Sequence, residues 1–322
     1  MTLMSLALVL AAPLPYWLLG LPWCLGDAGR RVPLTPLVGC ALAGLYAELC
    51  MIAGVSPRLG AAVLVVASAA FAVARGRQRA AELRTAILTW LPLYFFSVLA
   101  SSISPFPGLG TWSGDWLLLY QMGEQVVGGS LPSTMLARPP LFGAAATPLW
   151  IVGQGLIPYQ LMSAVASAGA VTATAFFTDY FWRRTSRVMW LPLLLSPFFL
   201  HHTAAAWAKL LAAGLILAAI IEARRAHVLA SAALFALSVA THEGSIIWAP
   251  CVLVAHAAGN RGWRGVARAV PPLRYAARGW PPRRAPAFRF DVSALVQAPR
   301  AARQNGPSRA GPGYQFPPIR RG

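Results

Sequence analysis

The chain has 322 residues, of which 57% are hydrophobic and only 11% are charged, and 27 basic side chains face nine acidic ones. This balance excludes an ordinary soluble globular domain. The net charge of +18 would suit a nucleic-acid-binding protein, but residues 259–322 alone carry +12 of it, with 13 arginines and one acid, Asp291. We therefore expect a membrane protein that has no nucleic-acid partner.

Four apolar runs occupy the first 104 residues. A membrane-spanning helix needs about 20 mostly apolar residues, because its backbone polar groups must be paired within the segment. The runs cover residues 5–25, 33–55, 59–74 and 86–104. No Lys or Arg precedes Arg30, so the charged start of a cleavable signal peptide is missing and we expect the first run to be retained. Residues 1–104 are thus predicted to form an N-terminal membrane region of four helices.

Residues 105–140 form the longest polar stretch between the apolar runs. They are rich in Pro and Gly and hold Asp115, Glu124 and Arg138. Long loops on rigid scaffolds often carry function. Within this stretch, residues 116–127 predict an amphipathic helix that lies at the membrane interface. We expect an extracytoplasmic loop with one short interfacial helix.

The part from 141 to 258 returns to apolar runs. They cover residues 141–157, 159–181, 188–203, 207–221, 228–241 and 244–258, and the last four are short for complete spans. The expected fold is all-α, a polytopic transmembrane helical bundle of about eight to ten spans.

Arginines between the runs predict its orientation, because they concentrate in cytoplasmic loops. Arg30 and Arg31 place the 105–140 loop outside, whereas Arg183 and Arg184 agree with that orientation only if one of the runs 141–157 and 159–181 does not cross. Either a re-entrant helix in one of these two runs or a failure of the charge rule would explain the disagreement, and the sequence leaves both alternatives open.

Residues 259–322 have a different character from the rest of the chain. They contain ten prolines and no sustained apolar period, which predicts a disordered basic C-terminal tail. One interpretation is a segment that binds anionic lipids at the membrane surface. The other is that a reading-frame shift after residue 258 replaced the native continuation.

Asp115 and Arg138 are the strongest candidates for chemistry. A carboxylate between Gly114 and Trp116 in a loop at the membrane face can act as a general base towards a hydroxyl group, and the alternative is a turn-forming aspartate. The guanidinium of Arg138 suits a pair of phosphate oxygens, and the alternative is an interfacial anchor. Both pairs of interpretations remain open on the residues alone.

Two segments carry a resemblance to a known family. GDWLLLYQMGEQVVGG (114–129) and ARPPLFGAAATPLW (137–150) resemble the first extracytoplasmic loop and the following helix of the GT-C membrane glycosyltransferases. Among these enzymes the two segments resemble most the glycosyltransferase family 39 superfamily, which includes dolichyl-phosphate-mannose protein mannosyltransferases and bacterial lipid A aminoarabinose transferases. That family has an acid near a GDW-like step and a Lys/Arg-Pro-Pro-Leu motif. SPFFLHHTAAAWAKLLA (196–212) is similar to its later helix pair.

The resemblance implies an inverting transferase in the plasma membrane of a bacterial cell envelope. It would move a sugar from a polyprenyl-phosphate donor to a lipid, glycan or protein acceptor outside the cytoplasm. The family's catalytic base maps onto Asp115, and its phosphate-facing residues map onto Arg138 and Lys209, the only lysine; Glu124 is a further substrate-binding candidate. No cofactor is expected, and no metal site, because the adjacent His201 and His202 point about 100° apart on a helix.

The chain also departs from that family. Four apolar runs precede the loop where the family usually has one, and Trp116 stands where many members have a second acid. A complete member continues with further segments where the basic tail begins, which predicts a truncated and inactive copy as one outcome. The alternative classes are a transporter or flippase, with Glu48 and Lys209 lining its pathway, and a non-catalytic membrane subunit.

Overall fold

The computed structural model describes residues 3–25, 32–76, 80–103, 114–130, 139–153, 155–182, 193–204 and 206–269, all within one compact unit, Met1–Leu273. Of the residues so described, 88% are helical and none lies in a strand. The all-helical membrane fold expected from the sequence is confirmed. The last described helix, α14, runs to Ala269 and so includes the first residues of the expected tail, and residues 270–322 lie outside the described residues.

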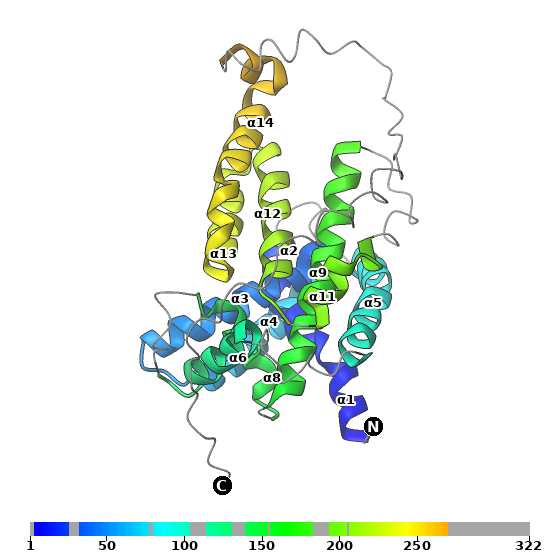
Figure 1. Ribbon diagram of the computed structural model, residues 1–322, viewed down its shortest axis with the longest axis vertical. Helices are drawn as coiled ribbons and strands as arrows, with labels where there is room; N and C mark the ends of the chain where they lie inside the picture. Colours follow the sequence, from blue (N-terminus) through cyan, green and yellow to red (C-terminus); the bar gives the residue numbers. More distant parts are fainter. Residues whose placement is uncertain are drawn as a thin grey trace, which may run out of the picture. The chain divides into compact units, whose positions relative to one another are not determined.

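Figure 1 shows the described helices, coloured in chain order. In chain order they are α1 (Leu3–Ala11), α2 (Pro13–Leu25), the short 3-10 helix η1 (Val32–Leu34), α3 (Thr35–Ile52), α4 (Pro57–Gly76), α5 (Ala80–Ile103), α6 (Gly114–Val127), α7 (Leu141–Ala144), α8 (Thr147–Trp150), α9 (Leu156–Trp182), α11 (Pro197–Ala204), α12 (Lys209–Arg224), α13 (Val228–Thr241), the 3-10 helix η4 (Glu243–Trp248) and α14 (Ala249–Ala269).

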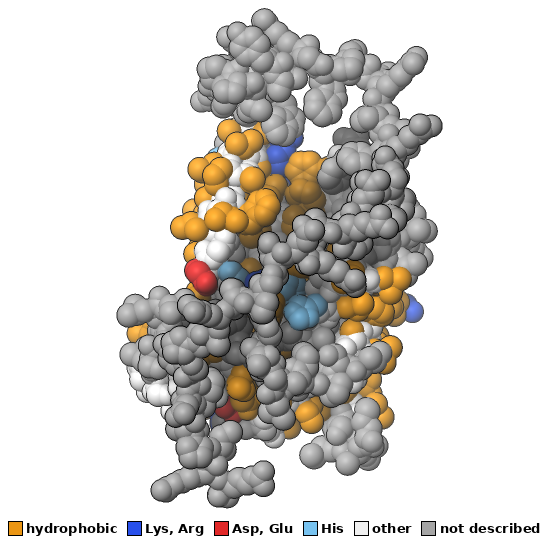
Figure 2. Space-filling model, viewed as in Figure 1, with side chains coloured by type: hydrophobic (Ala, Val, Ile, Leu, Met, Phe, Trp, Pro, Cys, Tyr) orange, Lys and Arg blue, Asp and Glu red, His pale blue; other side chains and the backbone are white. Residues whose placement is uncertain are grey.

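Five helical segments of the described part are long and apolar enough to cross a membrane. They are Leu6–Trp23, Val32–Ile52, Pro57–Ala74, Ala80–Ser102 and Leu156–Phe181, and α13 is a shorter apolar helix. Large apolar side chains point outward from them: Val66 of α4 is 69% exposed and Leu229 of α13 is 86% exposed. Figure 2 shows hydrophobic side chains over much of the described surface on that face. Such a surface is that of a membrane protein rather than a water-soluble one.

The run 141–157, expected as one candidate span, is instead broken into α7 and α8. Pro148 has no N–H to donate to the carbonyl of Ala144, and the hydroxyl of Thr147 donates to that oxygen instead, over 2.6 Å. Every residue from Leu141 to Trp150 is buried. The first span is interrupted in the same way: Pro13 leaves the carbonyl of Val9 free, and Tyr94 donates to it over 2.8 Å.

The later runs match their expected bounds in part. Of the run 188–203, residues 188–192 lie outside the described residues, and the described remainder holds the helical Leu193 and Leu194 and the eight-residue α11. The runs 207–221 and 228–241 correspond to α12 and α13. The run 244–258 begins as η4 and becomes the 21-residue α14.

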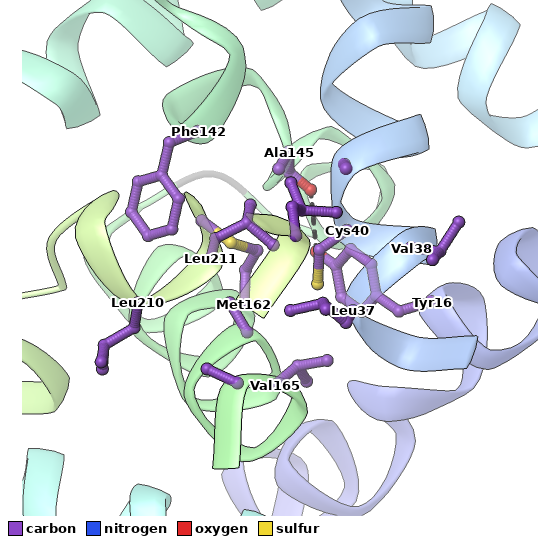
Figure 3. Packing of buried hydrophobic residues seen from close by; sticks show 14 of the residues in the cluster. Tyr16, Leu37, Val38, Cys40, Phe142, Ala145, Met162, Val165, Leu210 and Leu211 are labelled. Carbon is purple, nitrogen blue, oxygen red and sulfur yellow. Dashed lines mark hydrogen bonds between the residues drawn. The ribbon is translucent and has the colours of Figure 1, made fainter. Parts of the chain in front are cut away.

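The core lies where α2, α3, α9 and α12 pack together. A Cβ atom at Gly39 would lie 1.9 Å from the carbonyl oxygen of Tyr16, so α2 and α3 touch through their backbones, as small residues allow in membrane helices. The hydroxyl of Tyr16 crosses this core and donates to the carbonyl of Ala145 over 2.9 Å (Figure 3). This bond anchors the buried link between α7 and α8 to the N-terminal helices.

Candidate functional site

The predicted site residues fall on two parts of the fold. Asp115 is the second residue of α6; its backbone is helical and its side chain lies outside the described residues. Arg138 also lies outside the described residues. Glu124 lies on α6 and Lys209 is the first residue of α12. The structure therefore gives side-chain geometry for Glu124 and Lys209.

The helix α6 forms where an amphipathic helix was expected, and its buried face packs on α7. A Cβ atom at Gly123 would lie 2.5 Å from the carbonyl oxygen of Gly143, and one at Gly143 would lie 2.0 Å from that of Leu119. The helix ends at Val127, and Gly129 just beyond it has a φ of +78°, the left-handed conformation that closes a helix C-terminus. The amide of Ser130 then bonds the carbonyl of Gln125 over 2.9 Å.

Tyr120 and Glu124 form a pair one turn apart on α6. The Tyr120 hydroxyl donates a short hydrogen bond to Oε1 of Glu124. Burial raises the pKa of Tyr120 above its ordinary value, and the hydrogen bond to Glu124 and its negative charge raise it further. Tyr120 therefore stays protonated at neutral pH and fixes the Glu124 carboxylate in one position.

An aromatic cluster joins this pair to the start of α12. The Tyr120 ring lies edge-on to Trp150 at 5.9 Å and to Tyr159 at 5.5 Å between centroids. Tyr159 is fully buried, and its hydroxyl donates to the carbonyl of Ala206 over 3.0 Å. Ala206 lies three residues before Lys209. The cluster thus links the Glu124 helix to the segment that leads into Lys209.

Lys209 lies beside a group of aromatic and imidazole rings. Its Nζ lies 4.6 Å from the centre of the Trp207 ring, a cation–π geometry. The His202 ring lies 4.8 Å from Trp207, and the His201 ring 5.1 Å from it. Burial, together with the charges of Lys209 and His201, lowers the pKa of His202 to about 4. His202 is therefore neutral at physiological pH.

An apolar cavity of about 730 Å³ opens next to Tyr120. Its walls come from α1 and from the turn between α8 and α9, with Leu8, Val152 and Leu156 among the lining residues. The chemistry of this lining suits a hydrocarbon chain, and Tyr120 supplies its polar edge.

Sequence reasoning missed the aromatic residues that connect the two parts. No motif in the sequence marks Tyr120, Trp150, Tyr159 or Trp207, and only their contacts show that they join α6 to the segment before α12. The described residues contain no group of three His, Cys, Asp or Glu side chains that could hold a metal ion. Glu48 lies on α3, and its buried Oε1 has no hydrogen-bond partner within the described part of the chain.

Composition and fold define the chain as a helical membrane protein. Comparisons with family models, with curated proteins and with solved structures found no match.

Proposed function

We propose that the protein is an integral-membrane glycosyltransferase that moves a sugar from a polyprenyl-phosphate donor to an extracytoplasmic acceptor. One observation carries the proposal: the two segments that resemble the GT-C family, 114–129 and 137–150, fold against each other. Their helices α6 and α7 touch through Gly123 and Gly143. Asp115, at the first turn of α6, and Arg138, just before α7, therefore come from two elements that share one packed unit.

In this proposal the carboxylate of Asp115 removes the proton of the acceptor hydroxyl. The hydroxyl oxygen then forms a bond to the anomeric carbon of the sugar, from the face opposite the phosphate. The bond between that carbon and the phosphate oxygen breaks, and polyprenyl phosphate leaves with the electron pair. Arg138 and Lys209 neutralise the charge that develops on the leaving phosphate, and Glu124, held by Tyr120, accepts hydrogen bonds from sugar hydroxyls.

The break between α7 and α8 supports a single orientation in the plasma membrane. If these short helices do not cross, α9 is the fifth crossing, and Arg183 and Arg184 after it fall on the same side as Arg30 and Arg31. That side is cytoplasmic, so the connection from α5 to α9, with α6 and α7, lies at the outer face. The lipid-linked donor and a lipid, glycan or protein acceptor would meet there.

A transfer assay tests the proposal. Membranes that carry the protein receive a radiolabelled polyprenyl-phosphate sugar and are scanned for labelled acceptor, for the parent and for Asp115→Asn. Loss of a general base lowers such rates by about 10²–10⁴-fold, so the variant should show almost no label.

The matched control is Asp179→Asn, the same chemical change near the C-terminal end of α9, which should transfer at the parent rate. Absence of label in all three proteins, although each folds, would contradict a transferase. Equal label in the parent and in Asp115→Asn would remove Asp115 as the base.

A further inference from the structure

The turn between α11 and α12 contains buried polar atoms that have no hydrogen-bond partner among the residues that the structure describes. They are Nδ1 of His202, Oγ1 of Thr203 and Nε1 of Trp207. His202 is 4% exposed and Thr203 is 1% exposed. A buried polar group that makes no hydrogen bond costs about 1–3 kcal/mol. Three such atoms within six residues indicate a place where another molecule supplies the missing partners.

The charge around these atoms favours an anion. Lys209 is 4.6 Å from the Trp207 ring, and no carboxylate of the described residues forms an ion pair with it. Lys209 is also the first residue of the 16-residue helix α12, whose N-terminus has no side-chain cap. Its first backbone N–H groups and the helix dipole both favour a negative group. A metal ion would be repelled by the ammonium group.

We infer that His202, Thr203, Trp207 and Lys209 form a binding site for the phosphate group of a membrane lipid. Trp207 and neutral His202 have ring N–H groups to donate, the Thr203 hydroxyl adds a third donor, and Lys209 supplies the charge. The phosphate oxygens are acceptors, so donor and acceptor types match.

The level of the site in the fold identifies a lipid as the source of the phosphate. The Oγ of Ser101, at the end of the membrane segment Ala80–Ser102, donates to the carbonyl of Ser97 over 2.9 Å and lies 3.4 Å from the carbonyl oxygen of Thr203. Tyr159, near the start of the segment Leu156–Phe181, bonds Ala206. The α11–α12 turn is thus held between one membrane helix end and one membrane helix start, where lipid headgroups lie.

This inference deepens the proposed function. Only the identity of the bound lipid, as the polyprenyl phosphate that carries the donor sugar, rests on that proposed function. Binding itself requires no transfer. The site adds His202, Thr203 and Trp207 to the groups that face the phosphate, and it separates phosphate binding from the base at Asp115.

The test measures equilibrium binding of radiolabelled polyprenyl phosphate to the purified full-length protein in detergent. Lys209→Ala should weaken binding by roughly tenfold or more, and Trp207→Phe, which keeps a ring and removes the N–H, by several-fold. Lys209→Arg should restore most of the affinity. The matched control Trp248→Phe, at an exposed tryptophan, should bind like the parent.

Two further ligands distinguish the source of the phosphate. Polyprenol, which has the same chain without the phosphate, should bind much more weakly, and inorganic phosphate should compete only at high concentration. Equal binding of polyprenol and polyprenyl phosphate would overturn the inference, as would inorganic phosphate that competes as well as the lipid. Unchanged affinity in folded Lys209→Ala and Trp207→Phe would also overturn it. Binding that depends on Lys209 without any sugar transfer would leave this site standing and contradict the transferase alone.

Discussion

Tyr159 holds Ala206 in place: its buried hydroxyl donates to the Ala206 carbonyl over 3.0 Å, while its ring lies 5.5 Å from the Tyr120 ring. Ala206 has a φ of +50°, a left-handed conformation that alanine rarely adopts. The strained turn before Trp207 and Lys209 is therefore fixed by a residue of α9 that also touches α6. The two halves of the candidate site depend on this one side chain.

Replacing Tyr159 with Phe should loosen that turn. The ring contacts remain, but the buried Ala206 carbonyl loses its partner, which costs about 1–3 kcal/mol. We expect a lower thermal unfolding midpoint in detergent and weaker polyprenyl-phosphate binding. Tyr46→Phe, at a partly exposed tyrosine of α3, serves as the control and should change neither quantity. An unchanged midpoint and affinity in Tyr159→Phe would show that the hydrogen bond does not organise the turn.

Gly143→Ala should separate α6 from α7. Its Cβ would lie 2.0 Å from the Leu119 carbonyl oxygen, a distance that no packing adjustment of side chains relieves, because the clash is with backbone. We expect destabilisation by more than about 2 kcal/mol and loss of sugar transfer. Gly153→Ala is the control, since a Cβ there meets nothing within 4 Å. Equal unfolding midpoints for the two variants would refute the close contact of these helices.

Ala226→Gly should stabilise the protein. Ala226 has a φ of +62° and follows the end of α12, where the amide of His227 bonds the carbonyl of Glu222 over 3.0 Å. Glycine removes the penalty of the left-handed conformation, a gain of about 1 kcal/mol. The control Ala213→Gly, at an exposed position inside α12, should instead lose about 1 kcal/mol. Thermal unfolding of both variants checks the prediction, and a lower midpoint for Ala226→Gly would contradict it.

His202 should make stability depend on pH in a defined window. Burial, with Lys209 and His201 nearby, lowers its pKa from about 6.5 to about 4, so the unfolded chain takes up the proton first as the pH falls. Stability is therefore retained above pH 6.5 and is lost as the pH falls from 6.5 to 4. The unfolding midpoint of the parent should fall more steeply over this range than that of His202→Gln. Parallel curves for the two proteins would show that His202 is not the group responsible.

The sequence predicted the helical fold from its apolar runs, and it marked α6 as a separate helix between two membrane regions. It did not predict the break at Pro148. The apolar run of 17 residues does not show whether the Ala144 carbonyl accepts its hydrogen bond from a backbone amide, as in a continuous helix, or from the hydroxyl of Thr147.

The candidate site was predictable in part. Lys209 was singled out as the only lysine of an apolar chain, whereas the orphaned atoms of His202 and Trp207 depend on which neighbours the turn does not provide. The spacing of apolar residues in a sequence does not show whether a buried polar atom will lack a hydrogen-bond partner. The roles of Asp115 and Arg138 rest on the resemblance and stay predictions.

In the proposed transferase, α6 and the α8–α9 turn lie on the same, outer side of the membrane. Single cysteines at Ser130, Gly153 and Ala80, all exposed positions, test this in a chain whose native cysteines are replaced by alanine. A membrane-impermeant maleimide applied to intact cells should label Ser130→Cys and Gly153→Cys, and should label Ala80→Cys only after lysis. Labelling of Ser130→Cys from outside but of Gly153→Cys only after lysis would mean that α7 and α8 cross the membrane, and would contradict the proposed site.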